Sequence, residues 1–269
     1  MIKADTREQI KGYIEGFIQS LIDANKRNDL KPTDLRPLKT FSATGDIKPF
    51  HEAILPNGIL LVNEFERSFS TKLGNTFEET AKLIGKDVYA EADRGHRIRG
   101  QVSNSTVAVI ETIVDQINHR SMKKTYLELV DQVISVPPND QIERQTIADL
   151  YLRDRDGNEL FFEIKSPKPN KGQCLEVYNR LLHIHALRKQ GPPKVKTYYA
   201  MAYNPNGNKR SDYSHAFSKN YLDLENQVLM GNEFWDMIGG PGTYEEVLDI
   251  YREVGKEKGP NMIRQLALE

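Results

Sequence analysis

The sequence predicts an α/β fold in which a mixed central β-sheet is flanked by helices and preceded by a mainly helical N-terminal part. Two observations support this class. Apolar residues recur at helical spacing in residues 6–24, 103–120 and 173–189, whereas residues 146–165 hold two apolar runs joined by turn residues. A block of strands set between helical segments is typical of a sheet covered by helices.

Composition excludes several classes of protein. The chain has 269 residues, of which 38% are hydrophobic and 28% charged, so it can bury a core and is too apolar for a disordered chain. No uncharged apolar run approaches the roughly 18 residues of a membrane span, so we expect no membrane partner. The single cysteine, Cys174, excludes an internal disulfide framework and a cysteine-based zinc cluster. We therefore expect a soluble protein of a reducing compartment.

An amphipathic helix is predicted over residues 6–24. Thr6 and Gln9 have the spacing of a capping box at its start. Its apolar stripe consists of Ile10, Tyr13, Ile14, Phe17, Ile18, Leu21 and Ile22. Such a stripe either packs inside its own subunit or forms a dimer surface, and the pattern leaves both possibilities open.

Three predictions complete the N-terminal part. Residues 27–60 are rich in Pro, Lys and Asp and are expected to be irregular. A helix is predicted over residues 65–84, with Gly74 as a candidate break, and another over residues 103–120.

The pattern then changes to strands. Residues 133–136 predict a short strand that ends at a Pro-Pro pair. Residues 146–153 and 159–165 predict two strands of a hairpin, joined by the turn residues 154–158.

The remaining chain returns to helices. A helix is predicted over residues 173–189, a strand over residues 196–203, and mainly helix beyond, with a turn at residues 239–242. Since no low-complexity linker interrupts the sequence, we expect one domain. Within the single domain 1–269, residues 1–125 are expected to be mainly helical and residues 130–203 to form the sheet core. Residues 204–269 are expected to be a mainly helical C-terminal part.

The predicted hairpin brings three charged side chains together. Glu163 and Lys165 are two residues apart on a strand and therefore share one face. If the loop consists of residues 155–157, counting inward from the turn places Asp149 directly opposite Glu163. A two-residue turn would shift the register by one and move Asp149 to the other face.

Two facing carboxylates repel each other unless a cation lies between them. Mg²⁺ suits such a pair, because it binds through one or two carboxylates together with waters and a phosphate. Asp149 and Glu163 are therefore the candidate ligands, and Lys165 is the residue expected to position an attacking water. The alternative is a surface hairpin whose Glu163 and Lys165 are merely solvated.

The segment resembles a known family. Asp149, followed 14 positions later by Glu163-Ile164-Lys165 at the end of an apolar strand, is similar to the core motif of PD-(D/E)XK nucleases, with Ala148 in place of the proline. This resemblance implies a restriction-endonuclease-like mixed central sheet and Mg²⁺-dependent cleavage of phosphodiester bonds. It also implies an upstream helix with a metal-proximal glutamate, for which Glu78 is the second-line candidate.

A narrower resemblance extends over most of the chain. Residues 6–10, 65–70 and 234–240 are similar to segments of type II restriction endonucleases grouped with TdeIII. This resemblance implies a homodimer that cuts double-stranded DNA at a short palindromic site, in the cytoplasm of a prokaryotic cell.

Basic and amide side chains give candidate DNA contacts. Residues 188–219 hold seven Lys or Arg and one Asp, although the formal net charge of the chain is only −1. Asn, Lys and Arg are the side chains that read purine edges or bind phosphates. The candidates are Asn206, Asn208, Lys209, Arg210, Arg97 and Lys168. A solvated surface loop is the alternative for the segment 188–219 and for Arg97.

Other reactive side chains are given structural roles. His183 and His185 are two apart on a predicted helix and cannot share a metal, so we expect one to pack in the core and one to lie at the surface. Cys174 is expected to be a buried structural thiol.

The leading hypothesis is therefore a type II restriction endonuclease. The first alternative is a structure-specific or repair nuclease of the same fold, and the second is a non-catalytic DNA-binding protein on that scaffold. The presence of Asp149, Glu163 and Lys165 together favours a catalytic protein, since a degenerate scaffold is expected to lose one of them.

Overall fold

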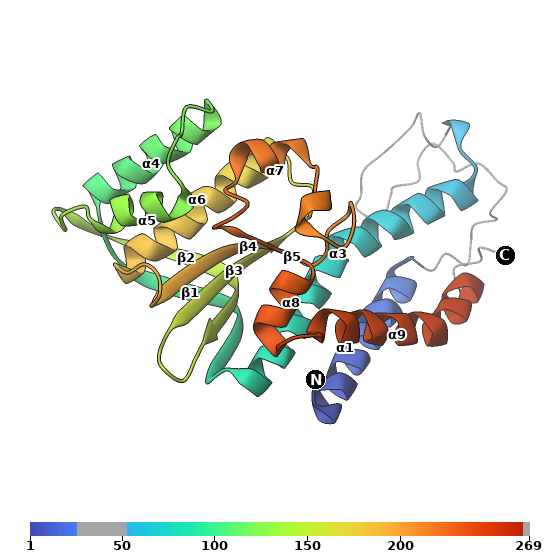
Figure 1. The fold of residues 1–269 in the computed structure, drawn as a ribbon. Coiled ribbons are helices and arrows are strands. Elements are labelled where there is room, and N and C mark those ends of the chain that lie inside the picture. The colour runs from blue at the N-terminus through green and yellow to red at the C-terminus, as the bar shows by residue number, and fades with distance from the viewer. Residues whose placement is uncertain (26–52, 266–269) are drawn as a thin grey trace. The chain divides into compact units, whose positions relative to one another are not determined.

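The structure is a computed structural model that describes residues 1–25 and 53–265 (Figure 1). It divides into two compact units. The first, called the sheet unit, comprises residues 1–2 and 77–245, and the second, called the helical unit, comprises the described parts of residues 3–76 and 246–269. The expectation of one domain over residues 1–269 stays a prediction.

A five-stranded mixed sheet forms the centre of the sheet unit, in the order β1-β2-β3-β4-β5. Strand β2 pairs antiparallel with both β1 and β3, whereas β4 pairs in parallel with both β3 and β5. The strands are β1 (Glu91–Ser103), β2 (Gln141–Arg153), β3 (Glu159–Lys165), β4 (Val195–Met201) and β5 (Val228–Met230). The predicted mixed α/β fold with flanking helices is confirmed.

Helices cover both faces of this sheet (Figure 1). On one face lie α4 (Asn104–Asn118), α5 (Tyr126–Ile134) and α6 (Lys171–Arg188), whose apolar residues form one core with Ile98, Phe161 and Tyr199 of the sheet. On the other face Phe162 contacts Phe234 of α8 (Asn232–Gly239). The short helices η1 (Arg210–Asp212) and α7 (Ala216–Tyr221) lie in the connection between β4 and β5.

The helical unit consists of α1 (Ala4–Asn25) and parts of α3 (Asn57–Val88) and α9 (Thr243–Gln265). The predicted amphipathic helix is confirmed as α1, and its isoleucines at 10, 14, 18 and 22 and Leu21 are buried. Lys11 of α1 forms ion pairs with Glu253 and Glu257 of α9 at 2.9 and 2.8 Å. The apolar stripe therefore packs largely within its own chain.

Two predictions about the N-terminal helices are wrong. Helix α1 begins at Ala4, so Thr6 lies inside its first turn rather than at the cap. Helix α3 continues through Gly74 without a break, because a single glycine costs a helix only about 1 kcal/mol relative to alanine. The predicted irregular segment 27–60 falls outside the described residues as far as residue 52, and α3 begins at Asn57.

The predicted strand at residues 133–136 is also wrong. Residues 133 and 134 are the last two residues of helix α5, and residues 135 and 136 follow it. A capping box formed by Thr125 and Glu128 lies at the start of this helix. Leu129, Val130 and Val133 lie on one helical face and are fully buried, so helical packing uses the same apolar residues that suggested a strand.

Two strands were not predicted. Strand β1 carries charged residues through most of its length, and β5 has only three residues. The predicted helix 173–189 and strand 196–203 are confirmed as α6 and β4. Among the described residues, no helix is long and apolar enough to cross a membrane.

Candidate active site

The hairpin between β2 and β3 has the predicted register. Arg153 pairs with Glu159 and Leu150 with Phe162, so the next position along β2 places Asp149 opposite Glu163. Gly157 has φ +78°, the left-handed conformation that the three-residue loop requires of its last residue. The structure therefore supports the longer loop on which the site prediction depended.

Asp149 lies where β2 and β3 separate. Leu150 and Phe162 are the last paired residues of these strands, and β2 continues from there against β1 alone. The Asp149 Oδ2 atom accepts hydrogen bonds from the backbone N–H of Ile164 at 2.9 Å and from Lys165 Nζ at 2.8 Å. These two bonds fix the carboxylate in the fork between the strands.

Glu163 is fully buried on the neighbouring strand. Its Oε2 atom accepts a hydrogen bond from Arg180 Nη1 at 2.8 Å and lies 3.3 Å from Lys165 Nζ. Its Oε1 atom is buried with no hydrogen-bond partner among the described residues. Burial, with the nearby Asp149 carboxylate adding to it, raises the pKa of Glu163 to about 7.

Lys165 links the two carboxylates. Its ammonium group contacts both Asp149 and Glu163. Burial lowers the pKa of Lys165, but the two carboxylates outweigh this effect and hold the pKa above its ordinary value. The lysine is therefore charged at neutral pH and compensates the repulsion between its two neighbours.

This donor set fits a hard divalent cation. An orphaned, buried carboxylate oxygen such as Glu163 Oε1 is an atom that still needs a positive partner. In the described part of the chain, no three His, Cys, Asp or Glu side chains cluster closely enough to hold a metal. The site accordingly suits an ion that takes two protein carboxylates and completes its shell with water and phosphate oxygens, as Mg²⁺ does.

Glu78 of α3 borders the site but is bound to another residue. Its Oε2 atom accepts a hydrogen bond from Arg94 Nε of β1 at 2.6 Å. Burial is the main cause that raises the pKa of Glu78, and the Asp149 carboxylate adds to this effect, which places Glu78 within electrostatic reach of Asp149. Glu78 thus stays a second-line candidate.

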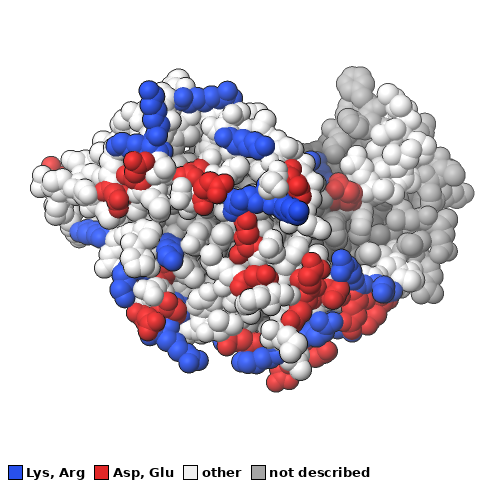
Figure 2. Space-filling model, viewed as in Figure 1, with Lys and Arg blue, Asp and Glu red and all other residues white. Residues whose placement is uncertain are grey.

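The candidate DNA contacts divide into two groups. Asn206, Asn208, Lys209, Lys168 and Arg97 are exposed. The predicted alternative of a loop at residue 97 is wrong, because Arg97 lies on β1, opposite Ile147 of β2. Figure 2 shows basic side chains interleaved with acidic ones on the viewed face of the sheet unit. On that face the two signs of charge are mixed.

Arg210 belongs to the second group, because its guanidinium is used within the fold. Two of its nitrogens bond the carboxylate of Glu233, and its N–H groups also donate to the carbonyl oxygens of Leu224 and Val228. Four of its five N–H groups are thereby satisfied. Arg210 is placed as a structural residue.

Arg180 is a site residue that the sequence analysis missed. It lies on α6, and its partner Glu163 is 17 residues earlier in the sequence. No motif with this spacing pairs an arginine with a glutamate. The one available signal was its position beside the apolar residues Val177 and Leu181, where a charged side chain needs a partner.

The histidines and the cysteine have the expected structural roles. His185 is buried, whereas His183 is half-buried and contacts the carbonyl oxygen of Asn179. Cys174 is buried, and burial raises the pKa of its thiol to about 11.

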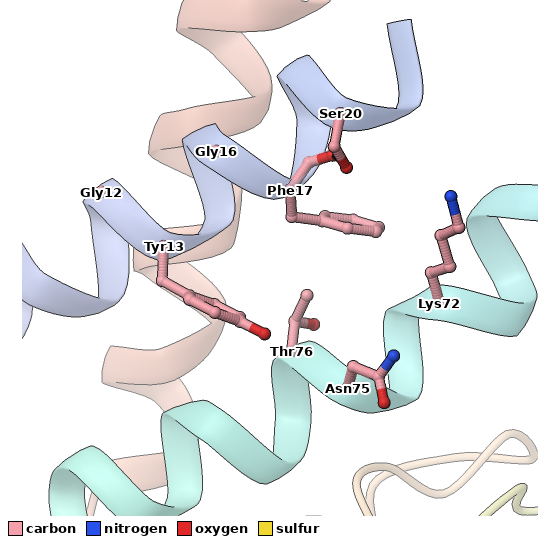
Figure 3. Close-up of a pocket in the computed structure, with 8 residues that line it drawn as sticks. All are labelled: Gly12, Tyr13, Gly16, Phe17, Ser20, Lys72, Asn75 and Thr76. Carbon is pink, nitrogen blue, oxygen red and sulfur yellow. Dashed lines mark hydrogen bonds between the residues drawn. The ribbon is translucent and has the colours of Figure 1, made fainter. Parts of the chain in front are cut away.

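The helical unit contains a cavity of about 540 Å³ between α1 and α3 (Figure 3). Figure 3 shows Tyr13 and Phe17 extending from α1 toward α3, where Lys72 and Thr76 line the opposite side. The lining contains one cation and no carboxylate, so this cavity is not a candidate metal site.

Comparison with known proteins finds a family model and several relatives that match this chain. Residues 2–255 match the family described as "Type II restriction endonuclease, HinfI". The chain is 42% identical to the type II restriction enzymes HgiBI, over 267 residues, and HgiEI, over 266 residues, both of Herpetosiphon aurantiacus. Each alignment covers 97% of this chain and 97% of the relative.

A more distant relative extends the set. The chain is 22% identical over 258 residues to the type II restriction enzyme MjaII of Methanocaldococcus jannaschii, an alignment that covers 89% of this chain and 67% of the relative. No solved structure matches the chain.

Proposed function

The chain belongs to the HinfI family of type II restriction endonucleases and is an enzyme of that class, a DNA-binding nuclease, for which we propose the following reaction and site. We propose that it hydrolyses phosphodiester bonds of double-stranded DNA at a short palindromic site with Mg²⁺. The observation that supports this best is the convergence of Asp149, Glu163 and Lys165 where β2 and β3 separate.

Each side chain has a proposed role. Asp149 and Glu163 would hold the metal, and the unpartnered Oε1 atom of Glu163 is available for it. Enzymes of this class generally depend on a divalent metal, which when bound supplies a Lewis acid at the phosphate. Lys165 donates a hydrogen bond that positions the attacking water and neutralises charge as it develops on the phosphate. A bond forms between the water oxygen and phosphorus and one P–O ester bond breaks, and the proton that the water loses balances the proton that the leaving oxygen gains.

The arrangement supports a place in the PD-(D/E)XK superfamily. Its features are an Asp on one strand, Glu-x-Lys on the antiparallel neighbour, and an upstream helix with Glu78. We propose this membership, and within it the group of TdeIII, as the finer classification.

DNA is proposed to contact two parts of the sheet unit. One is the loop with Asn206, Asn208 and Lys209, which leaves β4, together with Lys168, which follows β3. The other is the two-stranded ribbon formed by β1 and β2 beyond Asp149, because a ribbon of this kind fits the major groove.

The outer face of that ribbon carries side chains suited to DNA. Arg97 lies opposite Ile147 and Arg99 opposite Gln145, and all four are exposed. Neither arginine has an ion-pair partner in the described part of the chain. By contrast, every one of the arginines at 94, 153, 180, 188 and 210 is paired with a carboxylate.

We further propose a homodimer in the cytoplasm of a prokaryotic cell. Cutting both strands of a palindrome requires two active sites related by the two-fold symmetry of the DNA. Because the isoleucine stripe of α1 is buried within its own chain, we propose that the dimer surface lies elsewhere. Sedimentation of the protein with and without target DNA tests this, and a monomer under both conditions would contradict it.

Cleavage of phage DNA by the purified full chain tests the proposed reaction. We expect discrete fragments with Mg²⁺ and none with a chelator. Glu163→Gln should abolish cleavage, whereas Glu159→Gln, on the same strand and outside the site, should preserve it. A Glu163→Gln variant that cuts like the wild type would refute the proposed site. Cleavage of branched DNA alone would favour the structure-specific nuclease, and binding without cleavage would favour the non-catalytic alternative.

A further inference from the structure

Two arginines of α6 reach two glutamates of β3. Arg180 Nη1 donates to Glu163 Oε2 at 2.8 Å. Two turns further along the helix, Arg188 donates to both oxygens of Glu159, at 2.8 and 2.9 Å. The same helix and the same strand are thus joined twice, but only the Arg180 pair involves a proposed metal ligand.

Glu163 depends on Arg180 because its other cation is shared. Lys165 lies 2.8 Å from Asp149 and 3.3 Å from Glu163, so its shorter contact is with Asp149. Glu163 is fully buried, and a buried carboxylate requires close partners to remain charged and ordered. Arg180 lies closer to Glu163 than Lys165 does, at 2.8 Å against 3.3 Å, and it comes from helix α6 rather than from β2 or β3.

The arginine is itself held in place. Its Nη2 atom donates to Glu176 Oε1 at 2.7 Å, one helical turn earlier on α6. The resulting series Glu176–Arg180–Glu163 fixes the plane of the guanidinium and, through it, the orientation of the Glu163 carboxylate.

We propose that Arg180 is a positioning residue of the active site, an inference that rests on the proposed function. By occupying Oε2, it leaves Oε1 as the oxygen of Glu163 that is free for Mg²⁺, and it leaves Lys165 shared between Asp149 and Glu163. Without Arg180, Lys165 becomes the only cation among the described residues that pairs with Glu163, and it is drawn away from its position between the carboxylates.

A purely structural role predicts a different pattern of effects. If Arg180 only fastened α6 to β3, its loss would resemble the loss of Arg188, which has two hydrogen bonds to Glu159 and lies 5.5 Å from the centroid of the Phe161 ring. Arg188→Ala is therefore the matched control.

The experiment compares Arg180→Ala, Arg180→Lys, Arg188→Ala and Glu163→Gln in the full chain. Mg²⁺ binding is measured by titration calorimetry without DNA, cleavage by single-turnover kinetics over a range of Mg²⁺ concentrations, and stability by thermal unfolding. Residues that orient metal ligands typically contribute a factor of roughly 10 to 100 in metal affinity or activity, so we expect a loss of that size for Arg180→Ala.

Arg180→Lys and the control Arg188→Ala distinguish a positioning role of Arg180 from a purely structural one. Arg180→Lys should recover part of the Mg²⁺ affinity and activity that Arg180→Ala loses. An ammonium can bond Glu163, but it lacks the second nitrogen with which the planar guanidinium bonds Glu176. Arg188→Ala should lower the unfolding temperature while Mg²⁺ binding and cleavage stay near wild type. If Arg180→Ala does not fold, the same comparison is made with Arg180→Lys and Arg180→Gln.

Two results would overturn the proposal. One is wild-type Mg²⁺ binding and cleavage in the folded Arg180 variants, and the other is an equal loss in Arg188→Ala. Failure of the proposed function itself is recognised separately, because Glu163→Gln would then cut like the wild type whatever Arg180 does.

Discussion

The side chain of Asp149 bonds the backbone N–H of Ile164 across the fork between β2 and β3, at 2.9 Å. The Asp149 carboxylate therefore provides the hydrogen-bond acceptor for a backbone N–H group just beyond the last paired residues of the two strands. Asp149 has a structural role in addition to its proposed role as a metal ligand.

Asp149→Ala and Asp149→Asn should accordingly differ in stability but not in activity. Both variants should lose cleavage, because neither keeps the charged ligand. Asp149→Ala should also lower the free energy of unfolding by about 1–3 kcal/mol relative to Asp149→Asn, since only Asn keeps an acceptor for the Ile164 N–H group. Urea unfolding measures this difference, and equal stabilities would show that Asp149 does not support the fork.

The ribbon arginines should contribute to DNA affinity in a salt-dependent way. Replacing Arg97 and Arg99 by Ala should reduce the slope of log affinity against log salt by about 0.9 for each phosphate that the protein no longer neutralises, so affinity falls most at low salt. Arg155→Ala, at the exposed turn at the other end of β2, is the control. An unchanged slope and unchanged affinity would remove the ribbon from the DNA interface.

Neighbouring residues 209 and 210 should give opposite phenotypes. Arg210→Ala should lower the free energy of unfolding by about 2 kcal/mol, because it removes the guanidinium donor from Glu233 and from the carbonyl oxygens of Leu224 and Val228. Lys209→Ala should change stability little and weaken DNA binding. Denaturant unfolding and DNA titration separate the two effects, and an unstable Lys209→Ala variant with intact DNA affinity would reverse the assignment.

A buried histidine should make the fold sensitive to acid. His185 lies between the carbonyl oxygen of Gln190 and the hydroxyl of Thr197, and burial lowers its pKa to about 4. An unfolded histidine takes up a proton near pH 6.5, whereas the folded one does so only near pH 4. The contribution of His185 to the free energy of unfolding is therefore fully present above pH 6.5. It decreases by about 3 kcal/mol as the pH falls from 6.5 to 4.

His185→Gln should remove this part of the pH dependence, measured as the free energy of unfolding between pH 7 and pH 4. His119→Gln is the control, because the side chain of His119 is 66% exposed. If His185→Gln and the wild type lose stability in parallel over this range, the acid sensitivity arises elsewhere.

The sequence predicted the centre of the site because its geometry is local. A left-handed Gly157 sets the register of the hairpin, and that register alone decides that Asp149 faces Glu163. The Arg180–Glu163 contact joins a helix to a strand through tertiary packing, so no spacing along the chain revealed it.

The errors in the fold have equally physical causes. Strand β1 lacks an apolar pattern because its outer face, with Arg97 and Arg99, is exposed to solvent. Residues 133–136 are a short apolar run, which serves a buried helix as well as a strand, and the capping box of Thr125 and Glu128 was the signal that favoured the helix.

Anomalous diffraction from crystals soaked in Mn²⁺, a stand-in for Mg²⁺ with detectable scattering, would show directly whether Asp149 and Glu163 bind the metal. We predict a metal peak between β2 and β3, bonded to carboxylate oxygens of both Asp149 and Glu163, with Oε1 the ligand atom of Glu163. A protein that cuts DNA with Mn²⁺ while its metal peak lies away from these two carboxylates would contradict it.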